Sequence, residues 1–179
     1  MIALKNLLVA TDFSEPSDVA VTYGRVLAQA FGARLHLLHV VPEAMALPWA
    51  AATDGPSLAD IQQEWETEAA ERLRTAAPAE LREAGRVTLV TRAGDPGLEI
   101  VGYAKDHQID LVVLGTHGRG FVAHMFLGSV AERVVRLAPC PVLTVRHPQH
   151  EFVNEQLAAH VLHPEREEAA GIPTGTTAS

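Results

Sequence analysis

The strongest chemical signal in the sequence lies between residues 115 and 130. Residues 115–120 hold three glycines directly after an apolar run, and Gly128-Ser129 directly precedes another apolar run. Glycines let backbone amides approach a ligand closely, and the first turn of a helix has amides without intrahelical partners. Such amides, with the positive end of the helix dipole, bind phosphate groups. The pattern therefore indicates an anion site, to which His117 and Arg119 would add positive charge.

The same residues have a second, purely structural interpretation. A glycine-rich turn needs no ligand, and in this interpretation Ser129 serves solely as the N-cap of the following helix. Spacing alone leaves both interpretations open. Two other phosphate-binding motifs, the P-loop and the dinucleotide-binding motif, are excluded. The chain has no P-loop lysine motif. Residues 118–123 fit G-x-G-x-x-A, but they follow the fourth predicted strand and have no acidic residue roughly 20 positions later.

The elements that would position this segment alternate along the chain. Short apolar runs bounded by turn residues predict five strands, at residues 7–10, 34–41, 87–91, 111–114 and 141–145. Helical spacing between them predicts helices that begin at Ser14 or Ser17, Leu58, Pro96 and Ser129, the last with an apolar stripe of Val130, Ala131, Val134, Val135 and Ala138. This alternation predicts an open α/β sheet with helices on both faces. A strand order of 3-2-1-4-5 would bring Thr11-Asp12 and Gly115 into one crevice.

Two segments do not belong to this alternation. Residues 42–57 hold three prolines and no clear period and predict a long loop, in which Trp49 could cover a bound base or pack on the next helix. After Arg146 the chain has one short helical pattern, over residues 152–162, and then a polar tail. We therefore expect one domain over residues 1–146 and a C-terminal extension over 147–179, a short helix followed by a flexible tail.

Charge and composition exclude several classes of function. Residues 1–146 carry 13 basic and 17 acidic side chains and residues 147–179 one and five, so each part contributes −4 to the net charge of −8. Such a surface repels nucleic acids and anionic membranes. We expect a cytoplasmic protein, because no apolar stretch is long enough for a membrane span and the N-terminus lacks a leader pattern. A single cysteine, Cys140, excludes an internal disulfide, and no histidine spacing supports a metal site.

Several parts of the sequence together resemble the universal stress protein family. The similarity is carried by residues 7–14, 37–41, 110–130 and 140–145. The nucleotide-binding branch of that family has the motif G-x2-G-x9-G-[ST], which Gly115, Gly118, Gly128 and Ser129 match without a gap. The resemblance covers about residues 3–146. It implies a Rossmann-like five-stranded parallel sheet of order 3-2-1-4-5, similar to the adenine-nucleotide alpha hydrolases, and a bound ATP, ADP or AMP, with or without Mg²⁺.

The resemblance also implies roles for individual residues. Asp12 matches the ribose contact of the family, although a carboxylate there can also cap the following helix. Val40 matches the position whose backbone meets the adenine. The remaining residues implied to contact the nucleotide are Ala10, Thr11, Gly115, Thr116, His117, Gly118, Arg119, Gly128, Ser129 and Val130. No residue is expected to be catalytic or to bind a resident metal.

The function implied by the resemblance is an ATP-binding regulatory or stress-response module with an unidentified protein partner. The family resemblance suggests a homodimer that pairs the fifth strands, Val142–Val145, antiparallel, so a charge at Val142 or Val145 should weaken dimers. Two alternatives remain open at this point. One is a slow ATP hydrolase or autophosphorylating protein that uses Asp12, His117 and Ser129, and the other is an interaction protein with an empty crevice.

Overall fold

The fold is a five-stranded parallel sheet with helices on both faces. The computed structural model describes residues 3–46, 57–116 and 127–146. Its strands are β1 (Asn6–Ala10), β2 (Arg34–Val41), β3 (Val87–Ala93), β4 (Leu111–Gly115) and β5 (Val142–Val145). Its helices are α1 (Glu15–Phe31), α2 (Leu58–Ala76), α3 (Ala79–Glu83), α4 (Pro96–Asp106) and α5 (Ser129–Leu137), with a 3₁₀ turn η1 (Ala44–Ala46). The strand order β3-β2-β1-β4-β5 confirms the predicted topology.

The central strands are buried on both faces, which explains their continuous apolar sequences. Val9 of β1 lies between Leu37 of β2 and Val113 of β4 in the parallel register, and all three are fully buried. Alternate side chains point to opposite faces of a strand. Leu7 therefore packs into one apolar cluster and Leu8 into the other.

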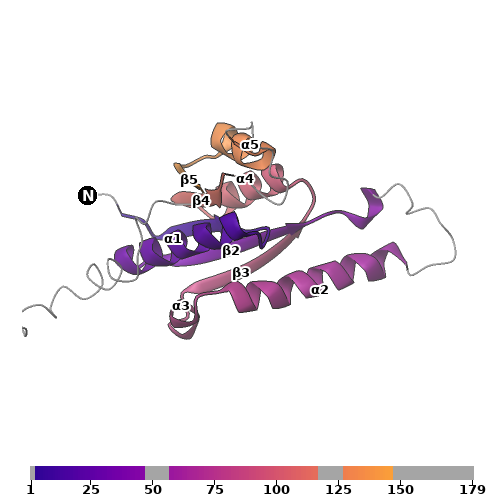
Figure 1. Cartoon of the computed structure of the whole chain (residues 1–179), viewed down its shortest axis with the longest axis horizontal. Helices are drawn as coiled ribbons and strands as arrows, with labels where there is room; N and C mark the ends of the chain where they lie inside the picture. Colours follow the sequence, from indigo (N-terminus) through magenta and orange to yellow (C-terminus); the bar gives the residue numbers. More distant parts are fainter. Residues whose placement is uncertain (1–2, 47–56, 117–126, 147–179) are drawn as a thin grey trace, which may run out of the picture. The chain divides into compact units, whose positions relative to one another are not determined.

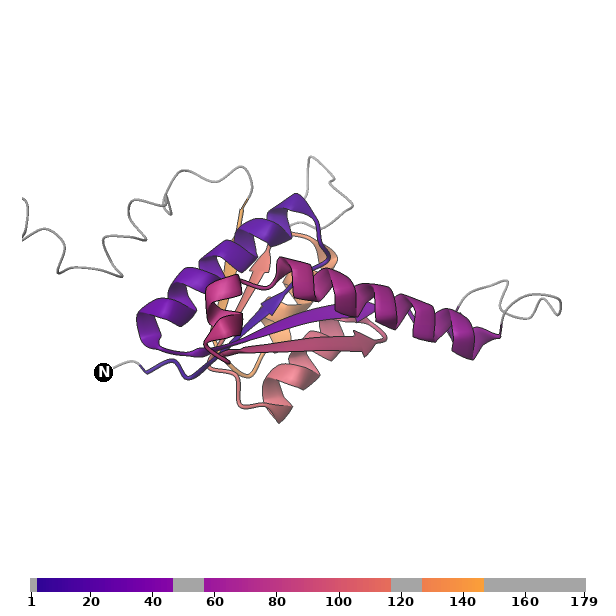
Figure 2. The ribbon, with the colours of Figure 1, turned by 90° about the horizontal axis from the view of Figure 1, so that it is seen from below.

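Different helices cover the two faces of the sheet. Residues of α1, α2 and α3 pack with one face of the sheet, and residues of α4 and α5 pack with the other. In Figure 1, α4 and α5 lie above the strands and α2 and α3 lie below them. Figure 2 shows the molecule from below, where α1, α2 and α3 lie in front of the strands. The sheet is therefore covered on both sides, as predicted.

Helix α1 begins and ends where its sequence signals predict. Ser14 is the N-cap, Ser17 completes a capping box with it, and Pro16 lies in the first turn. Gly32 follows the last turn with φ 65°, a left-handed conformation that favours glycine. Gly24 allows close packing on the sheet, because a Cβ there would lie 2.3 Å from Cγ2 of Val9.

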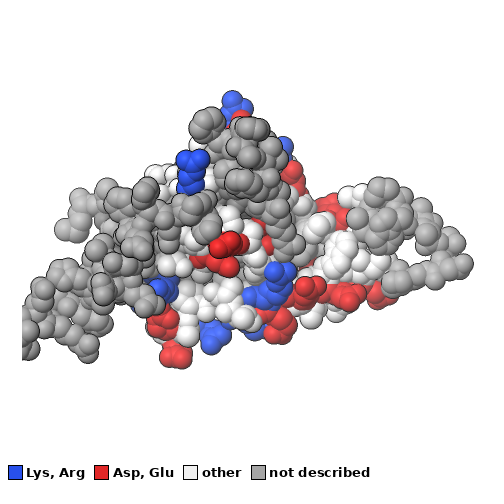
Figure 3. Space-filling model, in the orientation of Figure 1, with Lys and Arg blue, Asp and Glu red and all other residues white. Residues whose placement is uncertain are grey.

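Pro78 ends the second helical segment, as expected from its missing amide hydrogen. The N-cap Ser57 accepts a hydrogen bond from the Asp60 amide at the start of α2, and Pro78 separates α2 from the short α3. The outer surface of α2 exposes four glutamates, Glu64, Glu66, Glu68 and Glu71. In Figure 3 acidic side chains gather over this helix, which agrees with its polar, glutamate-rich sequence.

Two expectations for α5 are wrong. Ser129 is the first helical residue and Gly128 is the N-cap, so the serine does not cap its own helix. Val135 does not belong to a buried stripe, because its side chain is 48% exposed beside the exposed Leu137. The buried residues of α5 are Ala131 and Val134. The helix thus rests on a narrow apolar strip.

Two other predictions concern segments that the structure describes only in part. Of the predicted loop over residues 42–57, Ala44–Ala46 forms η1, and residues 47–56, with Trp49, lie outside the described residues. The predicted extension over residues 147–179 also lies outside them. Among the helices that the structure describes, none has the length and apolar character to cross a membrane.

Candidate functional site

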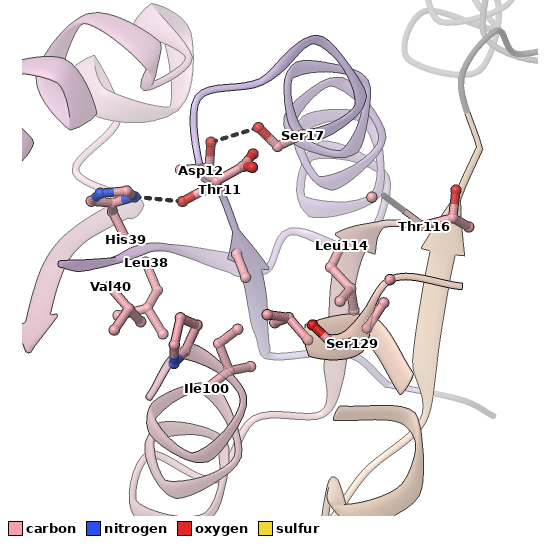
Figure 4. Close-up of a pocket in the computed structure, with 16 residues that line it drawn as sticks. Thr11, Asp12, Ser17, Leu38, His39, Val40, Ile100, Leu114, Thr116 and Ser129 are labelled. Carbon is pink, nitrogen blue, oxygen red and sulfur yellow. Dashed lines mark hydrogen bonds between the residues drawn. The ribbon is translucent and has the colours of Figure 1, made fainter. Parts of the chain in front are cut away.

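A crevice of about 370 Å³ lies at the carboxyl ends of β1, β2 and β4. The strand order explains this position, because β1 lies between β2 and β4, and the helices that follow β1 and β4, α1 and α5, cover opposite faces of the sheet. Figure 4 shows the lining side chains around the opening. The lining residues are Ala10, Thr11, Asp12, Ser17, Leu38, His39, Val40, Pro96, Ile100, Leu114, Gly115, Thr116, Gly128, Ser129, Val130 and Ala131.

Thr11 fixes the turn between β1 and α1. Its amide donates to the Leu38 carbonyl at 2.9 Å, so the residue continues the pairing with β2. Its side-chain oxygen lies 3.0 Å from that of Ser17 and accepts the Phe13 amide at 3.0 Å. Nδ1 of His39 donates to the Thr11 carbonyl at 2.7 Å (Figure 4). The crevice wall at Thr11 is therefore held from both β2 and α1.

Asp12 stands at the rim of the crevice with its carboxylate held in place. Its Oδ1 accepts the amide of Ser14 at 3.1 Å and also the Ser14 hydroxyl. Asp12 thus stabilises the helix start, as the capping alternative expected, while it also lines the crevice. A carboxylate has two oxygens and several acceptor positions, so the two roles are compatible.

Negative charge surrounds the first turn of α1. Burial raises the pKa of Asp18, the nearby carboxylates of Asp12 and Glu15 raise it further, and the positive charge of Arg72 partly offsets them. An anion bound in the crevice would therefore be repelled from this helix start. The arrangement favours hydroxyl groups near Asp12 and phosphate groups elsewhere.

One side of the crevice is apolar. Leu38, Val40 and Ile100 lie together there in Figure 4, and Pro96 and Leu114 also line the crevice. Leu38 is fully buried and Ile100 is 3% exposed. A flat, mostly apolar group such as a purine base could be held between these side chains, since binding pockets combine apolar walls with a few polar groups.

The opposite side is formed by the start of α5 and the end of β4. The Thr116 amide donates to the Val145 carbonyl at 2.8 Å, and the Thr116 carbonyl accepts the Gly128 amide at 2.7 Å. These two bonds fix the start of α5 beside the crevice. The N-cap Gly128 has no side chain, and among the described residues no side chain caps this helix start. The first helical amides are thus oriented as an anion site requires.

The structure brings nine of the twelve predicted site residues to this one crevice. They are Ala10, Thr11, Asp12, Val40, Gly115, Thr116, Gly128, Ser129 and Val130. The other three, His117, Gly118 and Arg119, lie outside the described residues. Contact of any of these residues with a nucleotide remains a prediction.

Sequence reasoning did not identify several lining residues. Ser17 could have been found from the helix-start pattern, because a serine at the third helical position points back to the preceding turn. Leu38 and Ile100 carry no chemical signal and are ordinary core residues by type. Their place in the crevice follows only from the strand order and from the position of α4.

The three described histidines, His36, His39 and His107, do not form a metal site. His36 and His39 face opposite sides of β2, as their spacing predicts: His36 Nδ1 lies 2.8 Å from the Tyr103 hydroxyl, and His39 contacts Phe13 and Thr11. Within residues 3–46, 57–116 and 127–146 no group of three or more potential metal ligands occurs together. The site therefore offers hydrogen-bond donors, one carboxylate and an apolar slot.

Three comparisons with known proteins agree with this geometry. A family model described as "Universal stress protein family" matches residues 3–146. Universal stress protein MJ0531 of Methanocaldococcus jannaschii is 32% identical over 149 residues, which are 82% of this chain and 85% of that protein. The match thus includes the whole sheet and the crevice.

Solved structures show the same similarity. The structure of the hypothetical protein MJ0577 superimposes with a TM-score of 0.68 at 27% identity and covers 83% of this chain and 100% of its own. A universal stress protein solved in complex with cAMP has a TM-score of 0.55 at 25% identity, with 81% and 98% covered. At least one protein of similar structure and sequence therefore binds an adenine nucleotide.

Proposed function

This chain belongs to the universal stress protein family, and from that premise we propose that it is a cytoplasmic regulatory module that binds ATP or a related adenine nucleotide. The observation that carries the proposal is the start of α5, whose N-cap Gly128 has no side chain, opposite an apolar slot. A nucleotide has a matching division, with a flat base at one end and phosphates at the other. The complex of a relative with cAMP supports the same ligand class.

The proposed pose follows from the chemistry of the two sides. The adenine would lie against Leu38 and Ile100, with the backbone of Val40 at its edge. The ribose hydroxyls would donate to the Asp12 carboxylate, which suits paired donors. The phosphates would face the amides at Ser129 and Val130, where the helix dipole is positive. In this pose each part of the ligand meets a group of complementary chemistry.

The regulatory role would depend on an exposed edge of the sheet. Among the described strands β5 pairs only with β4, so no described strand pairs with its outer edge, which could accept another strand. We propose that two copies pair along this edge. The charge substitution at Val145 considered above is not a clean test, because Val145 is 5% exposed and belongs to the core.

A sharper test of the dimer uses the backbone. The carbonyls of Pro141 and Val145 accept amides of β4 and its extension, so by alternation the amide of Thr144 points to the outer edge. Thr144→Pro removes that donor and should convert dimers to monomers in sedimentation velocity, whereas Thr144→Val should not. Unchanged sedimentation of Thr144→Pro would count against pairing through β5.

The nucleotide itself is tested by identifying what the protein carries. Purified protein is denatured, the supernatant is analysed by mass spectrometry, and titration calorimetry then compares ATP, ADP and AMP. We expect adenine nucleotide in the supernatant and saturable binding. Phosphate release measured on the same samples separates a binding module from a hydrolase. Absence of both released nucleotide and binding heat would refute the proposal.

A matched pair of variants tests the assigned pose. Asp12→Asn keeps an oxygen for the Ser14 amide but removes the charge that accepts the ribose hydroxyls. We expect affinity to fall roughly tenfold, the effect of one charge-assisted hydrogen bond. The control is Asp106→Asn at the exposed end of α4, which should bind like the wild type.

A further inference from the structure

The turn that carries Asp12 contains an unusual backbone conformation. Phe13 has φ 59°, in the left-handed region that disfavours residues with a side chain, and the other described non-glycine residue with positive φ is Gln108. An aromatic residue persists there only if its surroundings stabilise it. Because Phe13 directly follows Asp12, the conformation of Phe13 helps to decide where the Asp12 carboxylate points.

Two side chains hold the Phe13 ring. The imidazole centroid of His39 lies 4.4 Å from the ring centroid of Phe13. The guanidinium carbon of Arg72 lies over the same ring, 4.1 Å from its centroid. His39 is itself fixed by its hydrogen bond to the Thr11 carbonyl. We call Arg72, Phe13 and His39 the Phe13 bracket.

Through the Phe13 bracket, α2 is linked to a residue that lines the crevice, although Arg72 itself does not line it. His39 lines the crevice, but Arg72 and Phe13 do not. They line instead a smaller hollow of about 180 Å³, together with Trp65 and Glu68 of α2. Arg72 is partly exposed, and its guanidinium lies 3.9 Å from the Glu68 carboxylate. Arg72 does not line the crevice and yet contacts the turn that carries Asp12.

We infer that Arg72 and Phe13 are positioning residues for the nucleotide crevice, which hold the β1–α1 turn in the conformation that presents Asp12. This inference rests on the proposed function, because it concerns the same site. Because left-handed backbone is strained at a phenylalanine, relaxed conformations of the turn compete with this one. Apparent affinity falls in proportion to the population of the competent conformation. Removal of the cation over the ring therefore weakens nucleotide binding without touching the nucleotide.

The first test measures nucleotide affinity by calorimetry with ATP. Arg72→Met keeps the aliphatic stem but removes the cation, and the dissociation constant should rise roughly two- to fivefold, the range of a partly exposed cation–π contact. Arg72→Lys should restore most of the affinity. Arg74→Met, two residues further along the exposed surface of α2, is the control and should bind like the wild type. Equal affinity of Arg72→Met and wild type would overturn the inference.

A second pair of variants separates the ring from the backbone. Phe13→Asn removes the ring but tolerates a left-handed φ, whereas Phe13→Val keeps an apolar side chain but resists it. We expect Phe13→Val to weaken ATP binding more than Phe13→Asn, and both to weaken it more than Arg72→Met. Wild-type affinity in Phe13→Val would contradict the inference.

A ligand-free measurement distinguishes failure of this inference from failure of the proposed function. The Phe13 amide donates to Thr11 Oγ1 and the Ser14 amide to Asp12 Oδ1, so their hydrogen exchange reports on the turn. Arg72→Met should speed both by roughly two- to fivefold, with no change in Arg74→Met. If wild type binds no nucleotide, the proposed function fails while this exchange still tests the bracket. Unchanged exchange in Arg72→Met overturns the bracket whatever the protein binds.

Discussion

The two helices that wall the crevice on one face of the sheet, α4 and α5, begin in opposite ways. The N-cap of α4, Asp95, accepts the Leu98 amide at 3.0 Å and pairs with Arg133 at 2.6 Å. The N-cap of α5, Gly128, offers no side chain at all. A carboxylate at the start of α4 already neutralises that helix end, whereas no described side chain caps the start of α5, where water or a ligand could satisfy the first amides. The chemistry of the N-cap therefore decides which of the two helix starts could bind phosphate.

The far ends of these helices differ as well. Tyr103 of α4 is 3% exposed, its hydroxyl lies 2.8 Å from Nδ1 of His36, and its ring stacks on His107 with centroids 3.8 Å apart. On α5, by contrast, Val135 and Leu137 are about half exposed. Helix α4 is thus fixed to β2 near its C-terminal end and to α5 at its start, and we expect the second half of α5 to be the part of this layer that responds to a ligand.

The largest effect expected from this comparison comes from giving α5 the cap that α4 has. Gly128→Asp places a carboxylate on the amides that we assign to phosphate. Gly128 has φ −68°, so a side chain is tolerated by the backbone. Nucleotide affinity should fall by a hundredfold or more, about 3 kcal/mol, since like charges would meet at one site. Stability should stay within about 1 kcal/mol, because aspartate is a good N-cap.

The control for this prediction is Gly128→Ser, which can cap the helix without charge. It should weaken binding less than Gly128→Asp in the same calorimetric titration, with thermal unfolding followed in parallel. Wild-type affinity in a folded Gly128→Asp protein would show that phosphate does not bind at α5.

The same contrast shows how far the sequence could predict the structure. Apolar runs such as 111–114 predicted strands correctly, because a strand buried on both faces has little choice of composition. The capping residue of α5 was assigned one position too late, since Gly128 and Ser129 are both acceptable N-caps and only the backbone conformation distinguishes them.

The site was predictable only where residue type carries chemistry. Asp12 and the glycine pattern could be found because carboxylates and close backbone approach have specific uses. Ile100 and the Phe13 bracket could not be found, because an isoleucine in a crevice and a phenylalanine in a left-handed turn depend on packing between elements distant in sequence. The sequence therefore predicted most of the polar residues of the crevice, apart from Ser17 and His39, and missed most of its apolar ones.

The second largest effect concerns His36, which contacts Tyr103 of α4. Burial, and after it the neighbouring His107 and Arg34, lowers the pKa of His36 from 6.5 to about 4. The unfolded chain, with the ordinary pKa, therefore binds a proton below pH 6.5 that the folded chain does not. Stability should decrease as the pH falls through this window, by about 2 kcal/mol between pH 7 and pH 5 for this single group.

Urea unfolding at the two pH values measures this decrease. His36→Gln cannot titrate, so its stability should change less between pH 7 and pH 5 than that of the wild type, whatever its absolute value. His107→Gln, which removes the neighbouring ring instead, should retain most of the pH dependence. An equal pH dependence in wild type and His36→Gln would show that His36 is not the acid-sensitive group.

The smallest effects separate the two functions of Asp95. Hydrogen bonds from the Leu98 amide and then from Arg133 hold the pKa of Asp95 below its usual value. Asp95→Ala removes the cap and the ion pair and should lower stability by about 1 kcal/mol, whereas Asp95→Asn keeps the cap and should cost less. Arg133→Met removes only the exposed ion pair, which should contribute under about 1 kcal/mol.

Thermal unfolding measures these differences in stability. The ATP affinity should stay within about twofold in all three variants, because the start of α4 is assigned no phosphate. A loss of affinity in Asp95→Asn comparable to that of Gly128→Asp would instead mean that both helix starts act on the ligand together.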